Sequence, residues 1–258
     1  MKVVLFCGGL GTRMREHSDL IPKPLVDIGA RPIMWHLMRY YAHFGHKDFI
    51  LCLGYKGDMI REYFLNYEEC MSNDFVFSEG GKKLEPFQTD IHDWRITFVD
   101  TGLDANIGQR LLRVRKHLEG EEAFLANYAD GLTDMPLNEH IEEFRKRDNV
   151  ARFVATHPAQ SFHNVSADEE GNVTAFGAIA GSDIWLNAGF FCFRHDIFDY
   201  IKEGEELVLE PFDRLMERKL LTVTRYTGFW QQMDSLREKM IYDRMEAQGD
   251  CPWMVWKK

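Results

Sequence analysis

Apolar, strand-like runs alternate with helix-like segments along the first half of the chain, and this alternation restricts the fold more than any other feature. KVVLF (residues 2–6) and DFILCLG (residues 48–54) are short apolar runs, as expected of strands buried on both faces of a sheet. Between them, residues 31–45 carry apolar side chains at helical spacing, namely Ile33, Leu37, Tyr40, Tyr41 and Phe44. Strands that alternate with helices predict right-handed crossovers and a mostly parallel sheet.

The alternation continues as far as residue 147. Helical spacing predicts further helices over residues 57–67, about 108–118 and 137–147, and apolar runs predict strands at 94–102 and 123–131. We therefore expect an α/β fold with a Rossmann-like, mostly parallel sheet flanked by helices. Ligands on such sheets bind beyond the carboxyl ends of the strands, where both the CGGLGTR loop and the YADG segment are expected to lie.

Residues 150–230 show a different pattern, with short strand-like runs that predict a mixed β sublobe on the substrate side. Strands are predicted at residues 151–157, 185–194 and 220–228, with a hairpin through residues 165–176. No internal repeat, linker or low-complexity run separates the two halves, so we expect a single domain of residues 1–258. Residues 72–93 are polar and unpatterned, and we expect a long loop or a small insertion there.

The chain is acidic, with 41 aspartates and glutamates against 31 lysines and arginines in 258 residues, and its formal net charge is -10. That balance disfavours broad contact with nucleic acid or with an anionic membrane, and no apolar run is long enough to predict a membrane span. The N-terminal MKVVLFCGG lacks the pattern of a secretory signal, so we expect a cytoplasmic protein. The five cysteines show no metal-ligand spacing and are expected to be reduced, buried thiols.

A glycine-rich loop with two cations follows the first predicted strand. Gly8, Gly9 and Gly11 allow a tight turn whose N–H groups can face an anion, and Arg13 adds a forked cation for phosphate oxygens. The loop matches neither the dinucleotide fingerprint nor the Walker loop, and taken alone it is also compatible with a simple tight turn. The continuation to PKPL places prolines on both sides of Lys23, which stiffen the backbone and hold its ammonium in place.

The combination of GGxGTR and PKP resembles the sugar-phosphate nucleotidyltransferase family, and the resemblance spans nearly the whole chain. It narrows to the glucose-1-phosphate cytidylyltransferase branch through the stretches RPIMWHLMRYYAHFGHKDFILCLGYKGDMIREYF, FVDTG, RLLRV, YADG, NAGFF and GFWQQMDSLREK. The resemblance implies an enzyme that joins CTP to a phosphorylated small molecule. It assigns nucleotide binding to about residues 1–149 and acceptor binding to about residues 150–258.

The resemblance also implies which residues bind the nucleotide. It gives phosphate contacts to Lys23 and Arg13, which we expect to be the catalytic cations. Nucleotide binding falls on the loop and on the segment TGLDANIGQRL, at Leu5, Gly8, Gly9, Gly11, Thr12, Arg13, Gly102, Gly108 and Arg110. Arg110 could equally be a surface helix residue, and Cys7 is expected to belong to the strand core and not to act as a nucleophile.

Two aspartates are the implied ligands of a Mg²⁺ ion, namely Asp130 in YADG and Asp234 in WQQMDS. Mg²⁺ prefers one or two carboxylates together with phosphate oxygens and water, so two aspartates suffice. Taken alone, Asp130 could be a turn residue, and Asp234 could simply cap the helix that follows it. The pairing with a phosphate loop is what favours metal ligation.

The implied reaction is attack by an acceptor phosphate oxygen on the α-phosphorus of CTP, with release of pyrophosphate. Two anions must approach each other, so alignment and charge neutralisation are the main tasks, and no protein nucleophile is required. Lys23 and the metal would shield the α-phosphate, while Arg13 and the loop amides would stabilise the pyrophosphate.

The acceptor side departs from the family pattern. Sugar-using relatives usually carry a Glu-Lys-Pro tripeptide before the NGGFF-like strand, and here Ala178, Ile179 and Ala180 stand in its place. Relatives also tend to carry a glycine near the position of His163. We expect acceptor contacts from Lys23, His163, Asn187 and Gly189, and Arg194 or Lys202 could supply the missing charge from elsewhere.

Three interpretations of the function stay open at this point. The acceptor is glucose 1-phosphate, or it is another phosphorylated molecule such as a modified sugar, a phosphonate or an acyl or amino-acid phosphate. Alternatively, the chain is a nucleotide-binding regulator without turnover, which the lost lysine favours and the retained cations and aspartates disfavour. We also expect a homo-oligomer, from the resemblance and from the aromatic C-terminus with Trp253 and Trp256.

Overall fold

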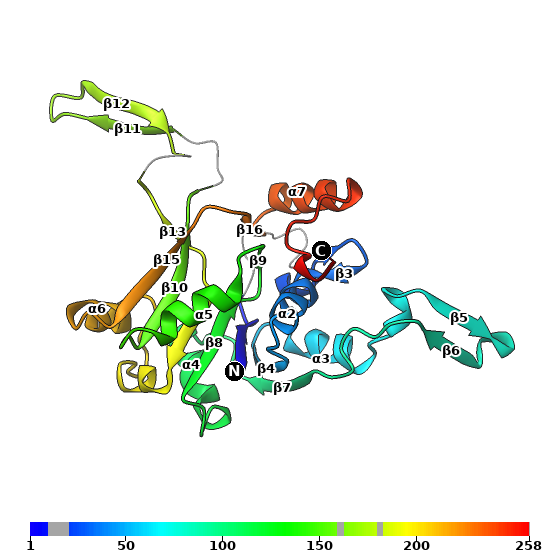
Figure 1. The fold of residues 1–258 in the computed structure, drawn as a ribbon. Coiled ribbons are helices and arrows are strands. Elements are labelled where there is room, and N and C mark those ends of the chain that lie inside the picture. Colours follow the sequence, from blue (N-terminus) through cyan, green and yellow to red (C-terminus); the bar gives the residue numbers. More distant parts are fainter. Residues whose placement is uncertain (10–20, 159–162, 180–182, 258) are drawn as a thin grey trace.

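The computed structural model describes residues 1–9, 21–158, 163–179 and 183–257. One sheet runs through the molecule and takes strands from both halves of the chain (Figure 1). Across the sheet the strands follow the order β7 (Arg95–Asp100), β4 (Asp48–Leu53), β1 (Val3–Phe6), β8 (Ala123–Tyr128), β14 (Phe191–Arg194) and β10 (Ala151–Thr156). Two further strands, β13 (Leu186–Asn187) and β15 (Leu221–Tyr226), also pair with β10.

The pairing changes from parallel to mixed along this sheet. β1 pairs in parallel with β4 and with β8, and β4 pairs in parallel with β7. β14 is antiparallel to both β8 and β10, and β15 is parallel to β10. The predicted α/β fold with a mostly parallel sheet and a mixed second half is therefore confirmed.

Helices cover both faces of the sheet, which explains why β1 is apolar at every position. Val3 and Leu5 share one core cluster with α2 (Ile33–His43), α3 (Gly57–Leu65) and α5 (Leu137–Arg145). Val4 and Phe6 share the other cluster with α4 (Ile107–Val114) and α6 (Glu210–Glu217). All four side chains of β1 are buried, as expected of a central parallel strand.

Two hairpins project from this body on opposite sides (Figure 1). One is β11 (His163–Ala167) with β12 (Val173–Ala178), close to the predicted hairpin. The other is β5 (Phe75–Ser78) with β6 (Lys83–Pro86), inside the segment for which we expected a loop or insertion. The hairpin is a small insertion, one of the two expected alternatives, and its strands carry apolar side chains such as Phe77 and Leu84, which pair across it and are 64% and 50% exposed.

Short pairings and the C-terminal segment complete the fold. The two-stranded pairings are β2 (Asp27–Ile28) with β3 (Arg31–Pro32), and β9 (Gly131–Thr133) with β16 (Trp230–Gln232). The short 3₁₀ helices are η2 (Lys23–Leu25), η3 (Glu69–Met71), η4 (Glu79–Gly81), η5 (Arg115–His117), η6 (His195–Asp199) and η7 (Val255–Lys257). The last long helix is α7 (Leu236–Ala247).

The C-terminal tryptophans pack on their own chain. Trp253 is fully buried against Tyr242 and Phe229, and Trp256 lies edge-on to Trp35. The aromatic C-terminus therefore needs no second copy to remove Trp253 from water, and that reason for expecting an oligomer was wrong. All five cysteines are free thiols, three of them buried and two half-buried. No helix within the described residues is long and apolar enough to cross a bilayer.

Candidate active site

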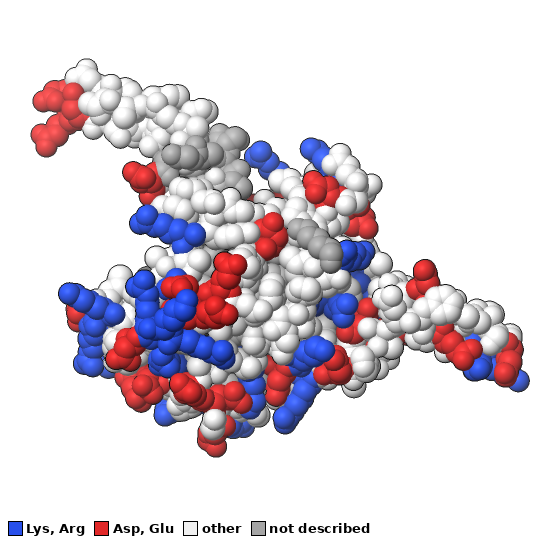
Figure 2. Space-filling model, in the orientation of Figure 1, with Lys and Arg blue, Asp and Glu red and all other residues white. Residues whose placement is uncertain are grey.

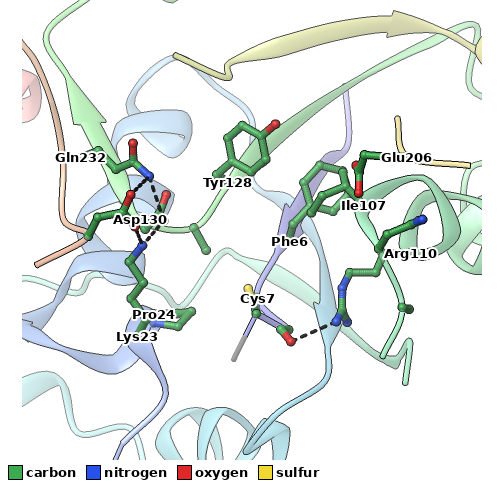
Figure 3. A pocket seen from close by; sticks show the side chains of 16 residues that line it. Phe6, Cys7, Lys23, Pro24, Ile107, Arg110, Tyr128, Asp130, Glu206 and Gln232 are labelled. Atoms are coloured by element: carbon green, nitrogen blue, oxygen red, sulfur yellow. Dashed lines mark hydrogen bonds and ion pairs between the residues drawn. The ribbon is translucent and has the colours of Figure 1, made fainter. Parts of the chain in front are cut away.

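A cavity of about 370 Å³ opens at the carboxyl ends of β1 and β8, where the alternating pattern predicts a ligand (Figure 3). Its walls come from the turn after β1, from η2, from the start of α4 and from the segment that follows β8. The lining residues are Phe6, Cys7, Gly8, Gly9, Lys23, Pro24, Ala105, Asn106, Ile107, Arg110, Tyr128, Ala129, Asp130, Glu206, Gln232 and Asp234.

Lys23 lies between the two aspartates that the sequence singles out. Its Nζ donates to Oδ2 of Asp130 at 2.5 Å and also to Oδ1 of Asp234. The three side chains are only 13%, 18% and 21% exposed, so the ion pairs are largely removed from water. Asp130 and Asp234 stand 107 and 211 positions after Lys23 in the chain, so three distant segments meet at one point of the cavity wall.

The local backbone explains how the two aspartates come together. Asp130 lies two residues beyond the end of β8, and β9 then pairs antiparallel with β16, with Gly131 opposite Gln232. The N–H of Met233 donates to the carbonyl of Asp130 at 2.8 Å. This bond holds the backbone of Asp234 beside that of Asp130, so their carboxylates face the same space.

Asp234 is not the cap of the helix that follows it. The N-cap of α7 is Ser235, and the carboxylate of Glu238 accepts from the backbone N–H groups of Ser235 at 2.8 Å and Asp234 at 2.6 Å. The side chain of Asp234 therefore stays available to the cavity, where Lys23 and Gln232 contact it.

The negative charges of Asp130 and Asp234 stabilise the positive charge of Lys23. Burial by itself lowers the pKa of Lys23, but the charges and hydrogen bonds of Asp130 and Asp234 outweigh it and raise this pKa above its usual value. The ammonium is therefore protonated at neutral pH. Burial raises the pKa of Cys7 well above its usual range, which agrees with a core thiol and not with a nucleophile.

Sequence reasoning missed Gln232. Its Nε2 donates to Oδ2 of Asp234 at 2.8 Å and reaches Oδ2 of Asp130 at 3.5 Å. Gln232 therefore orients both carboxylates from the side away from Lys23 (Figure 3). Its place two residues before Asp234, on the strand that pairs with β9, was the signal that could have identified it.

The pair of aspartates fits a magnesium ion better than a transition metal. Within the described part of the chain, no group of three or more His, Cys, Asp and Glu side chains is close enough to hold an ion. Two carboxylates on the wall of a cavity with room for a phosphorylated ligand suit Mg²⁺, which takes its other ligands from phosphate oxygens and water. A structural zinc site would need four protein ligands.

Arg110 is buried and does not lie on the helix surface. Its guanidinium donates to the carbonyls of Gly8 at 2.9 Å and Leu53 at 3.2 Å, and to Oγ1 of Thr101 at 2.7 Å. A side chain on Gly8 would collide with this guanidinium, which explains why a glycine stands there. Arg110 thus connects α4 to the ends of β1 and β4, at the edge of the cavity.

The other predicted nucleotide residues fall into three groups: those that line the cavity, those that do not, and those outside the described residues. Gly8 and Gly9 line the cavity, whereas Leu5 is buried in the middle of β1 and does not. Gly108 and Gly102 do not line it either. A Cβ on Gly108 would collide with the carbonyl of Glu205, and Gly102 adopts a φ of 81° beside Arg113. Gly11, Thr12 and Arg13 lie outside the described residues.

A second cavity of about 170 Å³ adjoins the first and contains the predicted acceptor residue Asn187. Its lining residues are Asn127, Tyr128, Asp130, Gly131, Asn187, Ala188, Trp230 and Gln232, so Tyr128, Asp130 and Gln232 border both cavities. Gly189, in the turn between β13 and β14, has a φ of 78°, and its N–H donates to Oδ1 of Asn187 at 2.9 Å.

His163 lies away from both cavities. It stands on the projecting hairpin opposite Ala178, where its ring stacks on Phe176 with centroids 5.1 Å apart. Ile179 directly follows this hairpin and lines neither cavity, and Ala180 lies outside the described residues. Arg194 pairs with Ala123, at the start of β8, so it lies at the opposite end of that strand from Asp130. It is therefore not placed to replace a missing acceptor cation.

Comparisons with known proteins identify the family of the chain. The family model described as nucleotidyl transferase matches residues 2–233. The chain is 37% identical to the glucose-1-phosphate cytidylyltransferase of Salmonella typhi, with 100% of both chains covered. It is 36% identical to the probable glucose-1-phosphate cytidylyltransferase of Bacillus subtilis strain 168, with 99% of this chain and 100% of that one covered.

Solved structures share the fold at lower identity. A putative glucose-1-phosphate thymidylyltransferase from Bacillus anthracis superposes with a TM-score of 0.67 at 16% identity, covering 95% of this chain and 94% of that one. A UDP-glucose pyrophosphorylase superposes with a TM-score of 0.69 at 16% identity, covering 96% and 98%. The chain belongs to the nucleotidyl transferase family and is a nucleotidyltransferase.

Proposed function

We propose that this enzyme transfers the cytidylyl group of CTP to the phosphate of a sugar 1-phosphate, with glucose 1-phosphate as the first candidate, and releases pyrophosphate. The observation that carries the proposal is the convergence of Lys23, Asp130 and Asp234 where two cavities adjoin. The full-length identity to glucose-1-phosphate cytidylyltransferases supports the choice of both substrates.

The two cavities suit the two substrates of an in-line displacement. The larger one has room for the nucleotide, and the smaller one takes the acceptor beside Asn187 and Trp230. An acceptor phosphate oxygen forms a bond to the α-phosphorus while the bond from that phosphorus to the bridging oxygen of the β-phosphate breaks. Pyrophosphate leaves with that oxygen.

Lys23 reduces the repulsion between the two phosphates. Its ammonium lies on the wall of the larger cavity and contacts Asp130, which borders both cavities. Preorganised positive charge in a site shielded from water stabilises the charge that develops in the transition state. Asp130 and Asp234 would hold Mg²⁺, which when bound neutralises phosphate charge and polarises the reacting phosphorus. Gln232 keeps both carboxylates in position.

The loop of Gly8, Gly9, Gly11 and Arg13 completes the nucleotide site in this proposal. Its first two glycines line the larger cavity, and the motif supports contacts from the Arg13 guanidinium and the loop amides to the β- and γ-phosphates. Stabilising these phosphates favours the departure of pyrophosphate.

A different acceptor is the second candidate, and Ile179 is the observation that favours it. Sugar-using relatives resemble this chain but carry a lysine near that position, and Arg194 does not replace it. If the missing cation matters, wild type uses glucose 1-phosphate poorly, and Ile179→Lys improves kcat/KM for it. An efficient wild type that Ile179→Lys impairs would exclude this second candidate.

The decisive experiment measures pyrophosphate release with CTP and Mg²⁺ over a panel of acceptors. The panel contains glucose 1-phosphate, other sugar 1-phosphates, phosphonates and acyl phosphates. The first proposal predicts the highest kcat/KM with glucose 1-phosphate. Release with another acceptor class alone would move the assignment to the second candidate, and no release with any acceptor would contradict both.

We further propose that the enzyme self-associates through its projecting hairpins. Both carry exposed apolar side chains, among them Phe77, Leu84, Val165 and Phe176. Figure 2 shows that the β11–β12 hairpin is uncharged over most of its visible length and acidic at its tip. Clustered apolar side chains on narrow arms are unfavourable in water unless a partner covers them.

A further inference from the structure

The larger cavity has two chemically different ends. Figure 3 shows Lys23, Asp130 and Gln232 on one side and Phe6, Ile107, Arg110 and Glu206 on the other, with Tyr128 between them. Phosphates and a divalent ion need the end that holds the ammonium and the two carboxylates. The apolar faces of Phe6, Ile107 and Tyr128 suit a planar base, so the base belongs at the end of Glu206.

Most polar side chains at the base end already have partners. The guanidinium of Arg110 donates to two buried carbonyls and a threonine hydroxyl. Oδ1 of Asn106 accepts from the N–H of Gln109 at 2.8 Å, and its Nδ2 donates to the carbonyl of Gly204 at 3.1 Å. A side chain that recognises the edge of a base must therefore have a donor or acceptor that is not already used within the protein.

Glu206 is that group. One of its oxygens, Oε1, accepts from the N–H of Leu207 at 3.0 Å, and no lysine or arginine of the described residues lies within ion-pair distance of its carboxylate. Both Glu206 and Tyr128, the neighbour on which its negative charge acts, line the cavity. Burial is the main cause that raises the pKa of Tyr128 to about 12, and the nearby charge of Glu206 contributes in the same direction.

The chain around Glu206 is held firmly. Gly204 accepts from Asn106, and Glu205 is paired with Arg214 through two hydrogen bonds, one of them 2.7 Å long. The backbone of Glu205 also packs directly on Gly108, where no side chain would fit. Leu207 is fully buried in the core. A carboxylate between such anchors is preorganised to read a ligand.

We infer that Glu206 selects cytosine by accepting a hydrogen bond from its 4-amino group. Carboxylates are suited to that amino group, whereas uracil and thymine carry a carbonyl oxygen at the same position. A carboxylate facing that oxygen leaves two acceptors opposed, which a hydrogen-bonding site rejects strongly. The inference rests on the proposed use of CTP and adds the residue that would distinguish CTP from UTP.

The test is Glu206→Gln, because glutamine has the same shape but offers an amide donor. With CTP, kcat/KM is expected to fall about 10- to 100-fold, the effect of losing one charge-assisted hydrogen bond. With UTP, kcat/KM is expected to stay level or rise, since the amide can donate to the 4-carbonyl. Glu203→Gln is the matched control: it removes the same charge from an exposed side chain in the same loop that lines neither cavity, and it should leave both values unchanged.

If Glu206→Gln lowers kcat/KM equally with CTP and UTP, and lowers it less with 2′-deoxy-CTP, then Glu206 contacts the ribose hydroxyls and the inference is overturned. An unchanged ratio of CTP to UTP would overturn it as well. Calorimetric binding of CMP and UMP separates this from a failure of the proposed function. If wild type prefers CMP and Glu206→Gln loses that preference, the inference holds even where no acceptor supports turnover, whereas equal binding of both nucleotides by wild type contradicts it.

Discussion

If Asp130 and Asp234 hold a divalent ion as proposed, Lys23 and that ion compete for the same two carboxylates. The ammonium lies within hydrogen-bonding distance of both aspartates, and a bound ion would displace it. Lys23→Met removes the competitor and is expected to tighten Mn²⁺ binding in the absence of nucleotide, measured by electron paramagnetic resonance. The same variant should lower kcat about 10²- to 10³-fold, the loss of one preorganised contact. Weaker Mn²⁺ binding in Lys23→Met would contradict this account.

The two aspartates are expected to be essential for turnover but not for folding. Asp130→Asn and Asp234→Asn keep the volume of each side chain, but a neutral amide holds Mg²⁺ poorly. Each variant should lose most activity at saturating Mg²⁺ while its circular dichroism spectrum stays that of wild type. Near-normal turnover in either variant would remove that residue from the metal site.

The sequence could predict individual site residues but not their partners. Lys23, Asp130 and Asp234 stand in recognisable motifs, and the structure brings them together. Gln232 stands in the same WQQMDS motif as Asp234, but its role depends on the pairing of β9 with β16, two strands about a hundred residues apart in the chain, so the motif alone did not single it out. His163 shows the reverse case. We expected His163 to contact the acceptor, but it lies on a projecting hairpin. The length and direction of that hairpin do not follow from the local sequence pattern, so the position of His163 could not be predicted.

Helix α4 packs on the sheet through Leu111 and Val114, and Arg110 adds hydrogen bonds to the ends of β1 and β4. Arg110→Met removes the guanidinium that donates to the carbonyls of Gly8 and Leu53. The carbonyl of Gly8 then loses this hydrogen-bond donor. We expect a loss of about 2 to 4 kcal/mol in the free energy of unfolding, measured with urea, because unpaired buried polar groups are costly. Arg110→Lys should not restore stability, since one ammonium cannot reproduce the planar fork. A loss of nucleotide binding without any loss of stability would contradict this structural role.

Helix α5 carries a histidine that makes stability depend on pH. Burial, with the charge of Arg152 next, lowers the pKa of His140 to about 4, and its Nε2 donates to the carbonyl of Phe190 at 2.9 Å. Because the folded pKa lies below the unfolded one near 6.5, the unfolded state binds the proton first as the pH falls. Between pH 7 and pH 5, this residue should therefore remove about 1 to 2 kcal/mol of stability.

Urea unfolding at both pH values tests this linkage. His140→Gln removes the titrating group and should lose less stability between pH 7 and pH 5 than wild type does. An equal loss in the two proteins would show that His140 does not contribute to the pH dependence.

The elements themselves follow the predicted order, and the departures have physical causes. Alternation identified the central strands and helices, because burial on both faces demands continuous apolar runs. The β5–β6 hairpin escaped prediction since its apolar side chains are exposed and intermixed with charges, so no buried face imposes a pattern. The predicted strand at residues 185–194 divides into β13 and β14 because Gly189 and Phe190 both adopt positive φ.

The whole molecule assembles the site by joining its two halves in one sheet. Parallel pairing of β1 and β8 aligns their carboxyl ends, and β14 and β10 extend the same sheet towards the smaller cavity, for which we propose the acceptor. On the face shown in Figure 2, lysines and arginines are interspersed with aspartates and glutamates, so this face carries no continuous basic stripe for nucleic acid.

The projecting hairpins predict an oligomer. Light scattering at micromolar concentration is expected to show more than one copy, and Phe77→Ser combined with Leu84→Ser should shift the mass downwards, because both side chains are exposed and paired on β5–β6. Met216→Ser on α6, which is 55% exposed, is the control and should leave the mass unchanged. A monomeric wild type would end this proposal.

Phosphorus NMR can follow the proposed cytidylyl transfer at the point where Lys23, Asp130 and Asp234 meet. With CTP, glucose 1-phosphate and Mg²⁺, the account predicts equal amounts of pyrophosphate and of a diphosphate-linked product with two coupled phosphorus signals. Asp130→Asn should form neither. Release of inorganic phosphate from CTP without a linked product, or full product formation by Asp130→Asn, would contradict the account.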